Sequence, residues 1–225
     1  VKMMNIDIND LTEDYLKSVI GDTSIDLVVG GPPCQSYSTL GKRQMDDRAN
    51  LFMQYKRVLT FIQPKAFVFE NVVGILSMDK GRLFQNVRKE FEELGYILKY
   101  KVLDAVDYGV PQHRERVILV GMKGDNNFEY PEPTHGDGLI PYVTLEDAIG
   151  DLPSLKSGQS ANTYAKGIDN DFLKFVRKRG VDVVTEHSAP KNGEGLIRIM
   201  EALGDGQSKN DLPESIRPKS GYGNT

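Results

Sequence analysis

The sequence predicts an α/β protein built on a doubly wound, mostly parallel β-sheet, followed by a less regular region. Two observations support this prediction. Over residues 1–124, short apolar runs alternate with segments in which apolar residues recur at helical spacing, as is typical of parallel βαβ units. From Asp125 onward the alternation fades, and prolines and glycines interrupt a mostly polar chain. We therefore expect a first domain over residues 1–124 and a linker with part of a second region over residues 125–225.

Apolar periodicity places the elements of the first domain in order. They are helices over residues 11–20, 51–62 and 83–94, and strands over residues 25–29, 66–69, 96–103 and 117–121. Asn9 or Asp10 can cap the first helix. Pro64 ends the second helix, and Gly95 follows the third. In the second region the pattern predicts only a short helix around residues 196–203.

Polar side chains follow the first two predicted strands. Cys34 comes after the first strand and a Gly-Gly-Pro-Pro turn, and Glu70 directly follows the second strand. Ligands of doubly wound sheets bind in the crevice beyond the carboxyl ends of the strands. We therefore expect Cys34 and Glu70 to share one pocket, whatever the family of the protein.

Each polar motif also has an ordinary structural interpretation. A lone cysteine is usually a small buried side chain, although the two prolines before Cys34 stiffen its turn, as aiming a nucleophile requires. Glu70 can cap a turn. Arg114 and Arg116 lie two apart on a predicted strand, so they project to the same face. There they either grip one anionic or carbonyl-bearing ligand or keep an exposed edge polar.

Three motifs occur in an order that resembles a known family. Pro-Cys-Gln at Cys34, Glu-Asn-Val at Glu70 and Gln-x-Arg-x-Arg at residues 112–116 are similar to the motifs of DNA cytosine-5 methyltransferases. The lead-in Asp-Tyr-Gly-Val-Pro at residues 107–111 matches as well. The resemblance covers residues 5–122 well and the remainder loosely. It implies the Rossmann-like fold of S-adenosylmethionine-dependent methyltransferases, with the start of a target-recognition region after it.

The resemblance also implies a reaction. Cys34 would add to carbon 6 of a cytosine flipped out of duplex DNA, so that carbon 5 accepts a methyl group. Glu70 would contact N3, Arg116 would hold O2, and Arg114 would support Glu70 and a backbone phosphate. The segment that follows Cys34 resembles the family's mobile active-site loop. The residues expected to contact DNA from this loop are Gln35, Ser38, Lys42, Arg43 and Arg48.

S-adenosylmethionine is the implied methyl donor, and S-adenosylhomocysteine is the implied product. The residues that match family positions around this cofactor are Asp7, Ile8, Pro33 and Leu51. Asp7 can equally be a simple loop or capping acid. The family's glycine-rich Phe-x-Gly-x-Gly turn does not occur before Asp7, and its closing Asn-x-Val motif and final helix are missing. We therefore expect a fragment that binds the cofactor poorly unless the missing parts are supplied.

Charge alone does not indicate a nucleic-acid partner, because the formal net charge is −4. The basic residues are nevertheless grouped. One group lies on the predicted loop, and a second group has the members Lys174, Arg177, Lys178 and Arg179. Charge runs are usually solvated faces. The resemblance favours DNA contact for the first group and, weakly, for the second.

Composition limits the remaining possibilities. The 225 residues contain one cysteine, which excludes an internal disulfide framework and a cysteine-rich zinc site. No apolar run is long enough to span a membrane. We expect a monomeric, metal-free bacterial protein of the cytoplasm, associated with the nucleoid and with a restriction-modification or orphan system. The alternatives are a transfer-RNA cytosine methyltransferase of the same family, a non-catalytic member that binds DNA or a partner, and an unrelated cysteine hydrolase.

Overall fold

The computed structural model describes residues 3–33, 49–177, 180 and 182–218. The chain divides into two compact units, Val1–Val143 and Thr144–Thr225. This division falls after Val143, whereas the sequence pattern predicts a boundary after residue 124. The segment after residue 124 belongs with the first unit because it bonds to the sheet. The Tyr130 hydroxyl, for example, donates to the main-chain oxygens of Lys99 and Ile118 at 3.0 and 2.9 Å.

The first unit contains every helix and strand that the periodicity predicts. These elements are α1 (Glu13–Ile20), β1 (Leu27–Gly30), α2 (Ala49–Ile62), β2 (Ala66–Val72), α3 (Arg82–Glu92), β3 (Ile97–Asp104) and β4 (Glu115–Met122), with short 3-10 turns η2 (Val73–Leu76), η3 (Met78–Gly81) and η4 (Ala105–Tyr108). The cap of α1 differs from the prediction. Thr12, rather than Asn9 or Asp10, accepts a hydrogen bond from the main-chain nitrogen of Tyr15.

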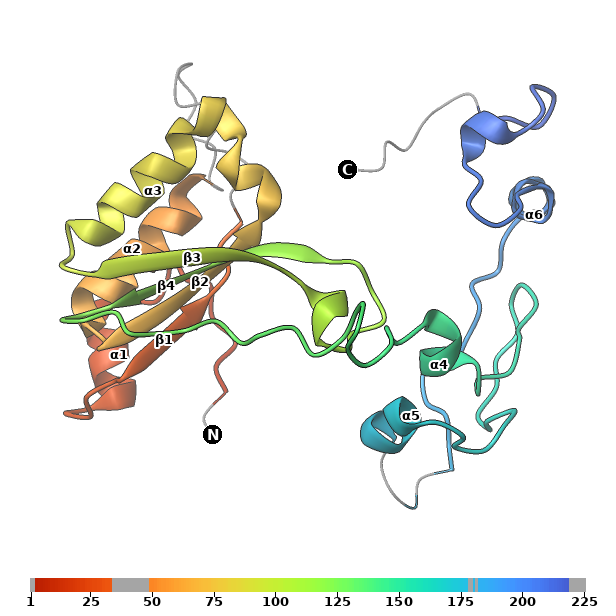
Figure 1. Ribbon diagram of the computed structural model, residues 1–225, viewed down its shortest axis with the longest axis horizontal. Helices are drawn as coiled ribbons and strands as arrows, with labels where there is room; N and C mark the ends of the chain where they lie inside the picture. The colour runs from red at the N-terminus through yellow and green to blue at the C-terminus, as the bar shows by residue number, and fades with distance from the viewer. Residues whose placement is uncertain (1–2, 34–48, 178–179, 181, 219–225) are drawn as a thin grey trace. The chain divides into compact units, whose positions relative to one another are not determined.

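The four strands form one sheet in the order β1-β2-β4-β3 (Figure 1). The α/β fold is confirmed, but the described sheet is mixed rather than mostly parallel. β1 and β2 are parallel, whereas β4 runs antiparallel to both β2 and β3. The reason is the short connection between β3 and β4, residues 105–114, which contains only the turn η4. A parallel return needs a crossover of a dozen or more residues, so β4 returns antiparallel.

Helices α2 and α3 pack on one face of this sheet (Figure 1). The core between them is aromatic. The ring of Phe91 from α3 lies 4.6 Å from that of Phe67 and 5.5 Å from those of Phe69 and Phe52. Such ring pairs each stabilise a core by about 0.5–1.5 kcal/mol beyond area burial. Gly121 leaves the space for the Phe67 ring, because a Cβ there would lie 2.2 Å from it. This core holds the carboxyl ends of β1 and β2 in place.

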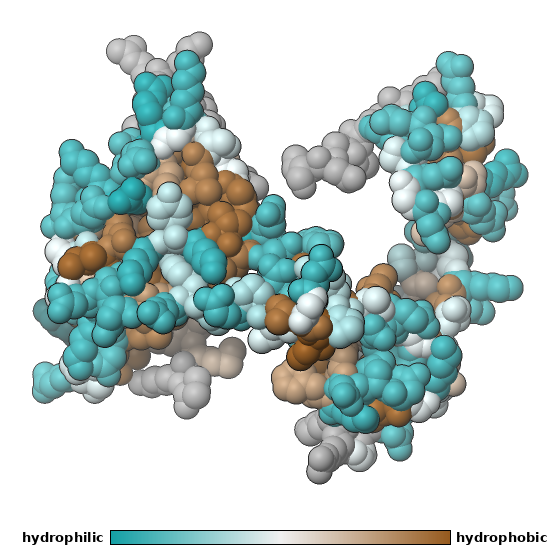
Figure 2. All heavy atoms as spheres, in the orientation of Figure 1, coloured by the Kyte–Doolittle hydropathy of each residue, from teal (hydrophilic) through white to brown (hydrophobic). Residues whose placement is uncertain are grey.

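The second unit is less regular, as predicted. Its helices are α4 (Leu145–Ile149), α5 (Asp171–Val176), α6 (Glu194–Ala202) and the 3-10 turn η5 (Lys209–Asp211), and α6 corresponds to the helix expected around residues 196–203. Its described residues form isolated β-bridges but no strand. Few apolar side chains are buried here, and Figure 2 shows hydrophobic residues at the surface among hydrophilic ones. Across the described part of the chain, none of the helices has the length and apolar content needed to cross a membrane.

Candidate active site at the carboxyl ends of β1 and β2

The ends of β1 and β2 lie side by side, as the sequence predicts. Gly30 pairs with Phe69 in parallel register, which brings the next residues, Gly31 and Glu70, together. The Glu70 carboxylate packs against the main chain at Gly31, where an added Cβ would lie 2.6 Å from Glu70 Oε2. Cys34 follows three residues later and lies outside the described residues. The carboxylate is therefore seated beside the segment that leads to Cys34.

Asn71 holds that segment from the other face of β2. Its side chain is 5% exposed, and its Nδ2 donates a hydrogen bond to the main-chain oxygen of Pro32 at 3.0 Å. Its Oδ1 accepts from the main-chain nitrogen of Val72 at 2.9 Å. Sequence reasoning gave Asn71 no role. The signal was available, because alternation along β2 puts Asn71 on the same face as the core residues Phe67 and Phe69, where a polar side chain needs a partner.

An ion pair joins β2 to β4 at this site. Arg116 Nε lies 2.8 Å from Glu70 Oε1, and the two side chains are 24% and 39% exposed. Arg116 pairs in register with Val72, two residues beyond Glu70 on the same face of the sheet. Because both side chains keep an accessible edge, the pair can present hydrogen-bonding atoms to a ligand. An exposed pair of this kind stabilises a fold by only about 0–1 kcal/mol.

Arg114 does not share the position of Arg116. β4 begins at Glu115, so Arg114 precedes the strand. Its main chain is bound: the nitrogen donates to Asp104 Oδ1 at 2.7 Å, and the oxygen accepts from Ala105 N at 3.1 Å. Its side chain is exposed and forms no ion pair with any described residue. Among these residues the structure brings Arg116 to Glu70, whereas the predicted contact between Arg114 and Glu70 is not formed.

Comparison with known proteins shows the family to which the chain belongs. A family model described as C-5 cytosine-specific DNA methylase matches residues 2–205. The chain belongs to that family. The resemblance carried by the Pro-Cys, Glu-Asn-Val and Gln-x-Arg-x-Arg motifs is thereby confirmed.

Relatives support this assignment. The chain is 34% identical over 224 residues to Type II methyltransferase M1.HphI of Haemophilus parahaemolyticus, covering 98% of this chain and 54% of that protein. It is 49% identical over 134 residues to M.BspRI of Lysinibacillus sphaericus, covering 57% of this chain and 32% of that one. A crystal structure described as a prophage-encoded DNA modification methyltransferase of E. coli matches with a TM-score of 0.54 and 27% identity, over 78% of this chain and 48% of that chain. The chain spans about half the length of the first of these relatives.

The residues expected around the methyl donor of this DNA methylase family lie in three segments. Asp7 is exposed, and its Oδ1 accepts hydrogen bonds from the main-chain and side-chain nitrogens of Asn9, both at 2.8 Å. The main-chain oxygen of Ile8 accepts from Arg57 Nη2 at 3.0 Å, which ties this segment to α2, the helix that carries Leu51. Pro33 is exposed beyond β1. The assignment of these residues to the adenosine part of the donor stays a prediction.

The residues expected to contact DNA have different outcomes. Gln35, Ser38, Lys42, Arg43 and Arg48 lie outside the described residues, as do Lys178 and Arg179 of the second basic group. Lys174 is exposed and pairs with Asp171 at 2.7 Å.

Arg177 corrects the expectation for the second basic group. Its side chain is 9% exposed, its Nε lies 3.1 Å from Asp151 Oδ2, and its guanidinium stacks 3.2 Å above the Tyr164 ring. The pair has ion-pair distance without hydrogen-bond geometry, since neither atom has a hydrogen-bond partner. A buried guanidinium cannot reach a phosphate. The predicted DNA contact of Arg177 is therefore wrong, and the residue belongs to the interior of the second unit.

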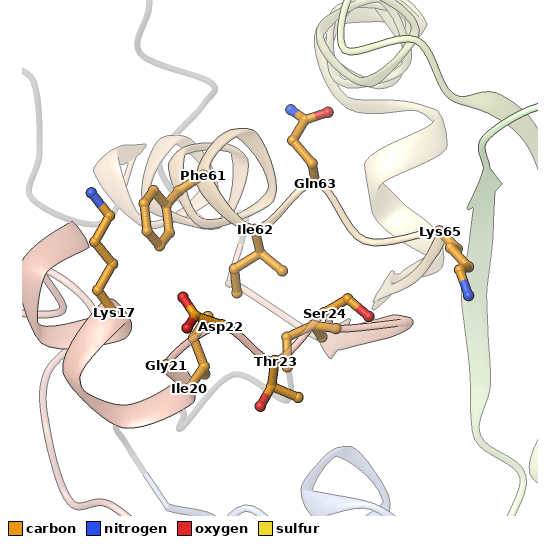
Figure 3. Close-up of a pocket in the computed structure, with 11 residues that line it drawn as sticks. Lys17, Ile20, Gly21, Asp22, Thr23, Ser24, Phe61, Ile62, Gln63 and Lys65 are labelled. Carbon is orange, nitrogen blue, oxygen red and sulfur yellow. The ribbon is translucent and has the colours of Figure 1, made fainter.

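An open pocket of about 510 Å³ lies at the opposite end of the sheet (Figure 3). Residues that precede β1 and β2 line it, including Ser24 and Lys65, together with Phe61 and Ile62 at the end of α2. Lys17 lies 5.6 Å from the centre of the Phe61 ring. Glu70 follows Lys65 by five positions along the extended chain of β2, or about 16 Å. This pocket is therefore separate from the candidate active site. The described residues contain no group of three or more acidic, histidine or cysteine side chains that could hold a metal ion.

Proposed function

We propose that the protein methylates carbon 5 of a cytosine flipped out of duplex DNA, through a covalent adduct with Cys34. The observation that carries the proposal is the pairing of Glu70 with Arg116 beside the main chain that leads to Cys34. Membership of the C-5 cytosine-specific DNA methylase family supports it, as do bacterial Type II methyltransferase relatives, which favour a restriction-modification setting.

The chemistry explains why these residue types are needed together. Carbon 5 of cytosine is a poor nucleophile until a thiolate adds to carbon 6. We assign that addition to Cys34, with the displaced electron pair moving toward N3. A hydrogen bond or proton from Glu70 at N3 would stabilise this charge, and Arg116 would hold the O2 atom. Loss of the carbon 5 proton and then of the Cys34 thiolate would restore the aromatic ring.

The methyl group has to come from a bound donor. S-adenosylmethionine would supply an electrophilic methyl group to carbon 5. Asp7, Ile8, Pro33 and Leu51 are the residues we assign to its adenosine part. Exclusion of water around Glu70 would strengthen each polar contact to the base. Because a base inside a duplex cannot present carbon 6 to a thiolate, the target nucleotide must leave the stack, as methyltransferases require.

Covalent trapping tests the proposal directly. The protein is incubated with S-adenosylmethionine and duplex DNA containing 5-fluorocytosine. Fluorine replaces the hydrogen on carbon 5, so no proton can leave that carbon and the covalent adduct persists. Digestion and mass spectrometry then locate the adduct. We expect it on Cys34 and expect none with Cys34→Ala. Because the chain spans about half of a relative's length, an N-terminally extended chain is tested in parallel. Absence of any adduct in both, on every DNA tried, would refute DNA cytosine methylation.

A second readout separates the nucleophile from the donor site. Thiolate addition alone makes carbon 5 exchange its hydrogen with water. Tritium release from DNA carrying [5-³H]cytosine is therefore measured without S-adenosylmethionine. We expect release that requires Cys34 and falls by more than about tenfold in Glu70→Gln and in Arg116→Lys, since general acid and electrostatic assistance contribute at least that much. A single-stranded RNA of the same sequence distinguishes a transfer-RNA enzyme, which would prefer it.

A further inference from the structure

Asp104 joins the two ends of the connection between β3 and β4. It is the last residue of β3, and its carboxylate accepts a hydrogen bond from the main-chain nitrogen of Val106 at 3.4 Å, at the start of η4. The same carboxylate accepts from the main-chain nitrogen of Arg114 at 2.7 Å, at the far end of the connection. Together with the main-chain bond from Ala105 N to Arg114 O at 3.1 Å, this side chain closes the connection of ten residues, 105–114, which contains the turn η4.

His113 completes this arrangement. Its Nδ1 lies 3.0 Å from Asp104 Oδ2. Since a carboxylate only accepts, Nδ1 carries the hydrogen and donates it. The imidazole is 79% exposed and the carboxylate 22%. The rings of His113 and Tyr142 also lie edge to face, with centres 6.3 Å apart.

The contacts of Asp104 lie at the point where β4 begins. In the register of the sheet Asp104 pairs with Glu115 and Leu103 pairs with Arg116. Arg116 in turn pairs with Val72 on β2, which sets its Nε 2.8 Å from Glu70. A slip of one residue at the start of β4 would turn Arg116 to the opposite face of the sheet. The contacts of Asp104 and His113 oppose that slip.

We infer that Asp104 and His113 act as a positioning pair that sets the register of β4 and so delivers Arg116 to Glu70. Neither residue touches a substrate in this role. Its importance for catalysis rests on the proposed function, but the placement of Arg116 does not. Three variants separate the contributions. Asp104→Ala removes the acceptor of all three hydrogen bonds, His113→Leu removes one donor, and His113→Asn keeps a donor nitrogen close to the position of Nδ1.

The first measurement needs no enzymatic activity. The exchange with water of the Arg116 Nε hydrogen is followed by nuclear magnetic resonance on the whole chain, with the signal assigned by its loss in Arg116→Lys. We expect exchange to quicken by about tenfold in His113→Leu, as loss of one hydrogen bond implies, and more in Asp104→Ala. His113→Asn should restore the slow rate. Asp26→Ala is the matched control, because it removes an exposed carboxylate paired with Lys65 at the other end of the sheet.

The second measurement is the single-turnover rate of adduct formation at saturating 5-fluorocytosine DNA. It should fall in His113→Leu and recover in His113→Asn, with the dissociation constant for DNA unchanged. Unaltered Arg116 exchange in both Asp104→Ala and His113→Leu would overturn the inference. If Asp104→Ala does not fold, the two His113 variants decide. If the parent protein forms no adduct, the proposed function fails. The exchange measurement would still test whether Asp104 and His113 position Arg116.

Discussion

Asn71 and Pro32 are joined by a hydrogen bond of 3.0 Å from the side-chain amide to the main-chain oxygen, across the parallel ends of β2 and β1. The bond ties the strand that carries Glu70 to the chain just before Cys34. Because Asn71 is buried, this link is protected from competition with water. The relative position of the Glu70 carboxylate and of the segment that leads to Cys34 therefore depends on Asn71.

Substitution of Asn71 tests this dependence. Asn71→Ala leaves the Pro32 oxygen without its donor, and we expect the free energy of unfolding to fall by about 1–3 kcal/mol. The rate of adduct formation at Cys34 should fall further than this loss of stability explains, when measured well below the unfolding temperature. Asn86→Ala is the control, since Asn86 is exposed on α3. Equal adduct rates in Asn71→Ala and the parent protein would show that the bond serves stability alone.

Gly31 is predicted to be intolerant of any side chain. In Gly31→Ala the new Cβ would lie 2.6 Å from Glu70 Oε2, so the carboxylate must shift and its 2.8 Å contact with Arg116 Nε must change. We expect faster exchange of the Arg116 Nε hydrogen and a loss of adduct formation of at least about tenfold, with the fold retained. Gly74→Ala is the matched control, because its Cβ would meet only Met78 Cε at 4.0 Å. Parent-like exchange in Gly31→Ala would mean that the site accommodates the methyl group.

Arg177 is predicted to stabilise the second unit rather than to bind DNA. Arg177→Met would leave Asp151 buried without a countercharge, at a cost of about 3–5 kcal/mol. We expect hydrogen exchange to rise throughout residues 144–218 and to stay unchanged in the first unit.

Two companion variants sharpen that test. Replacing Asp151 by Leu together with Arg177→Met removes both charges and should recover much of the stability. Lys174→Ala removes an exposed cation of the same basic group and should leave exchange unaltered. Weaker DNA binding in Arg177→Met, with unchanged hydrogen exchange, would restore the contact with DNA.

The raised pKa of Tyr55 predicts how the stability of the first unit changes at alkaline pH. Burial, and secondarily the nearby Tyr96, raises the pKa of Tyr55 well above its usual 10.0, and its hydroxyl donates to the main-chain oxygen of Val68 at 3.0 Å. A raised folded-state pKa contributes stability that is complete below the unfolded value and is lost as pH rises toward the folded value. Stability should therefore decline above about pH 10.

Tyr55→Phe separates the two contributions of that hydroxyl. At pH 7 it should lower the free energy of unfolding by about 1 kcal/mol, through loss of the hydrogen bond. Above pH 10 the deficit should shrink, because phenylalanine has no proton to lose. Denaturant unfolding at both pH values measures this. Tyr96 and Tyr130, each with a pKa raised to about 12 by burial, remain in both proteins and contribute to the residual alkaline slope. A deficit that stays constant with pH would contradict the assignment.

Local pattern was sufficient for much of the site. Helical and strand spacing located every α-helix and β-strand of the first unit, because each of them buries one face and its period is visible in a short window. The expectation that Cys34 and Glu70 share a pocket followed from the rule that the carboxyl ends of parallel strands meet, and the structure shows Gly31 beside Glu70. The motifs around Cys34, Glu70 and Arg116 indicated the family, and the match over residues 2–205 confirmed it. The proposed contacts of the residues after Pro33 stay predictions.

The sequence by itself determined the α/β character of this protein, its family and the residue types at its candidate site. Only the tertiary structure decided that β4 lies antiparallel between β2 and β3, so that Arg116 and not Arg114 meets Glu70. It also decided that Arg177 is buried and that Asn71 binds Pro32. The physical reason is the separation along the sequence of the residues that make these contacts. Periodicity reports which face of an element is buried, whereas these contacts join residues far apart in sequence, whose pairing depends on strand register and on competition among all the packed elements.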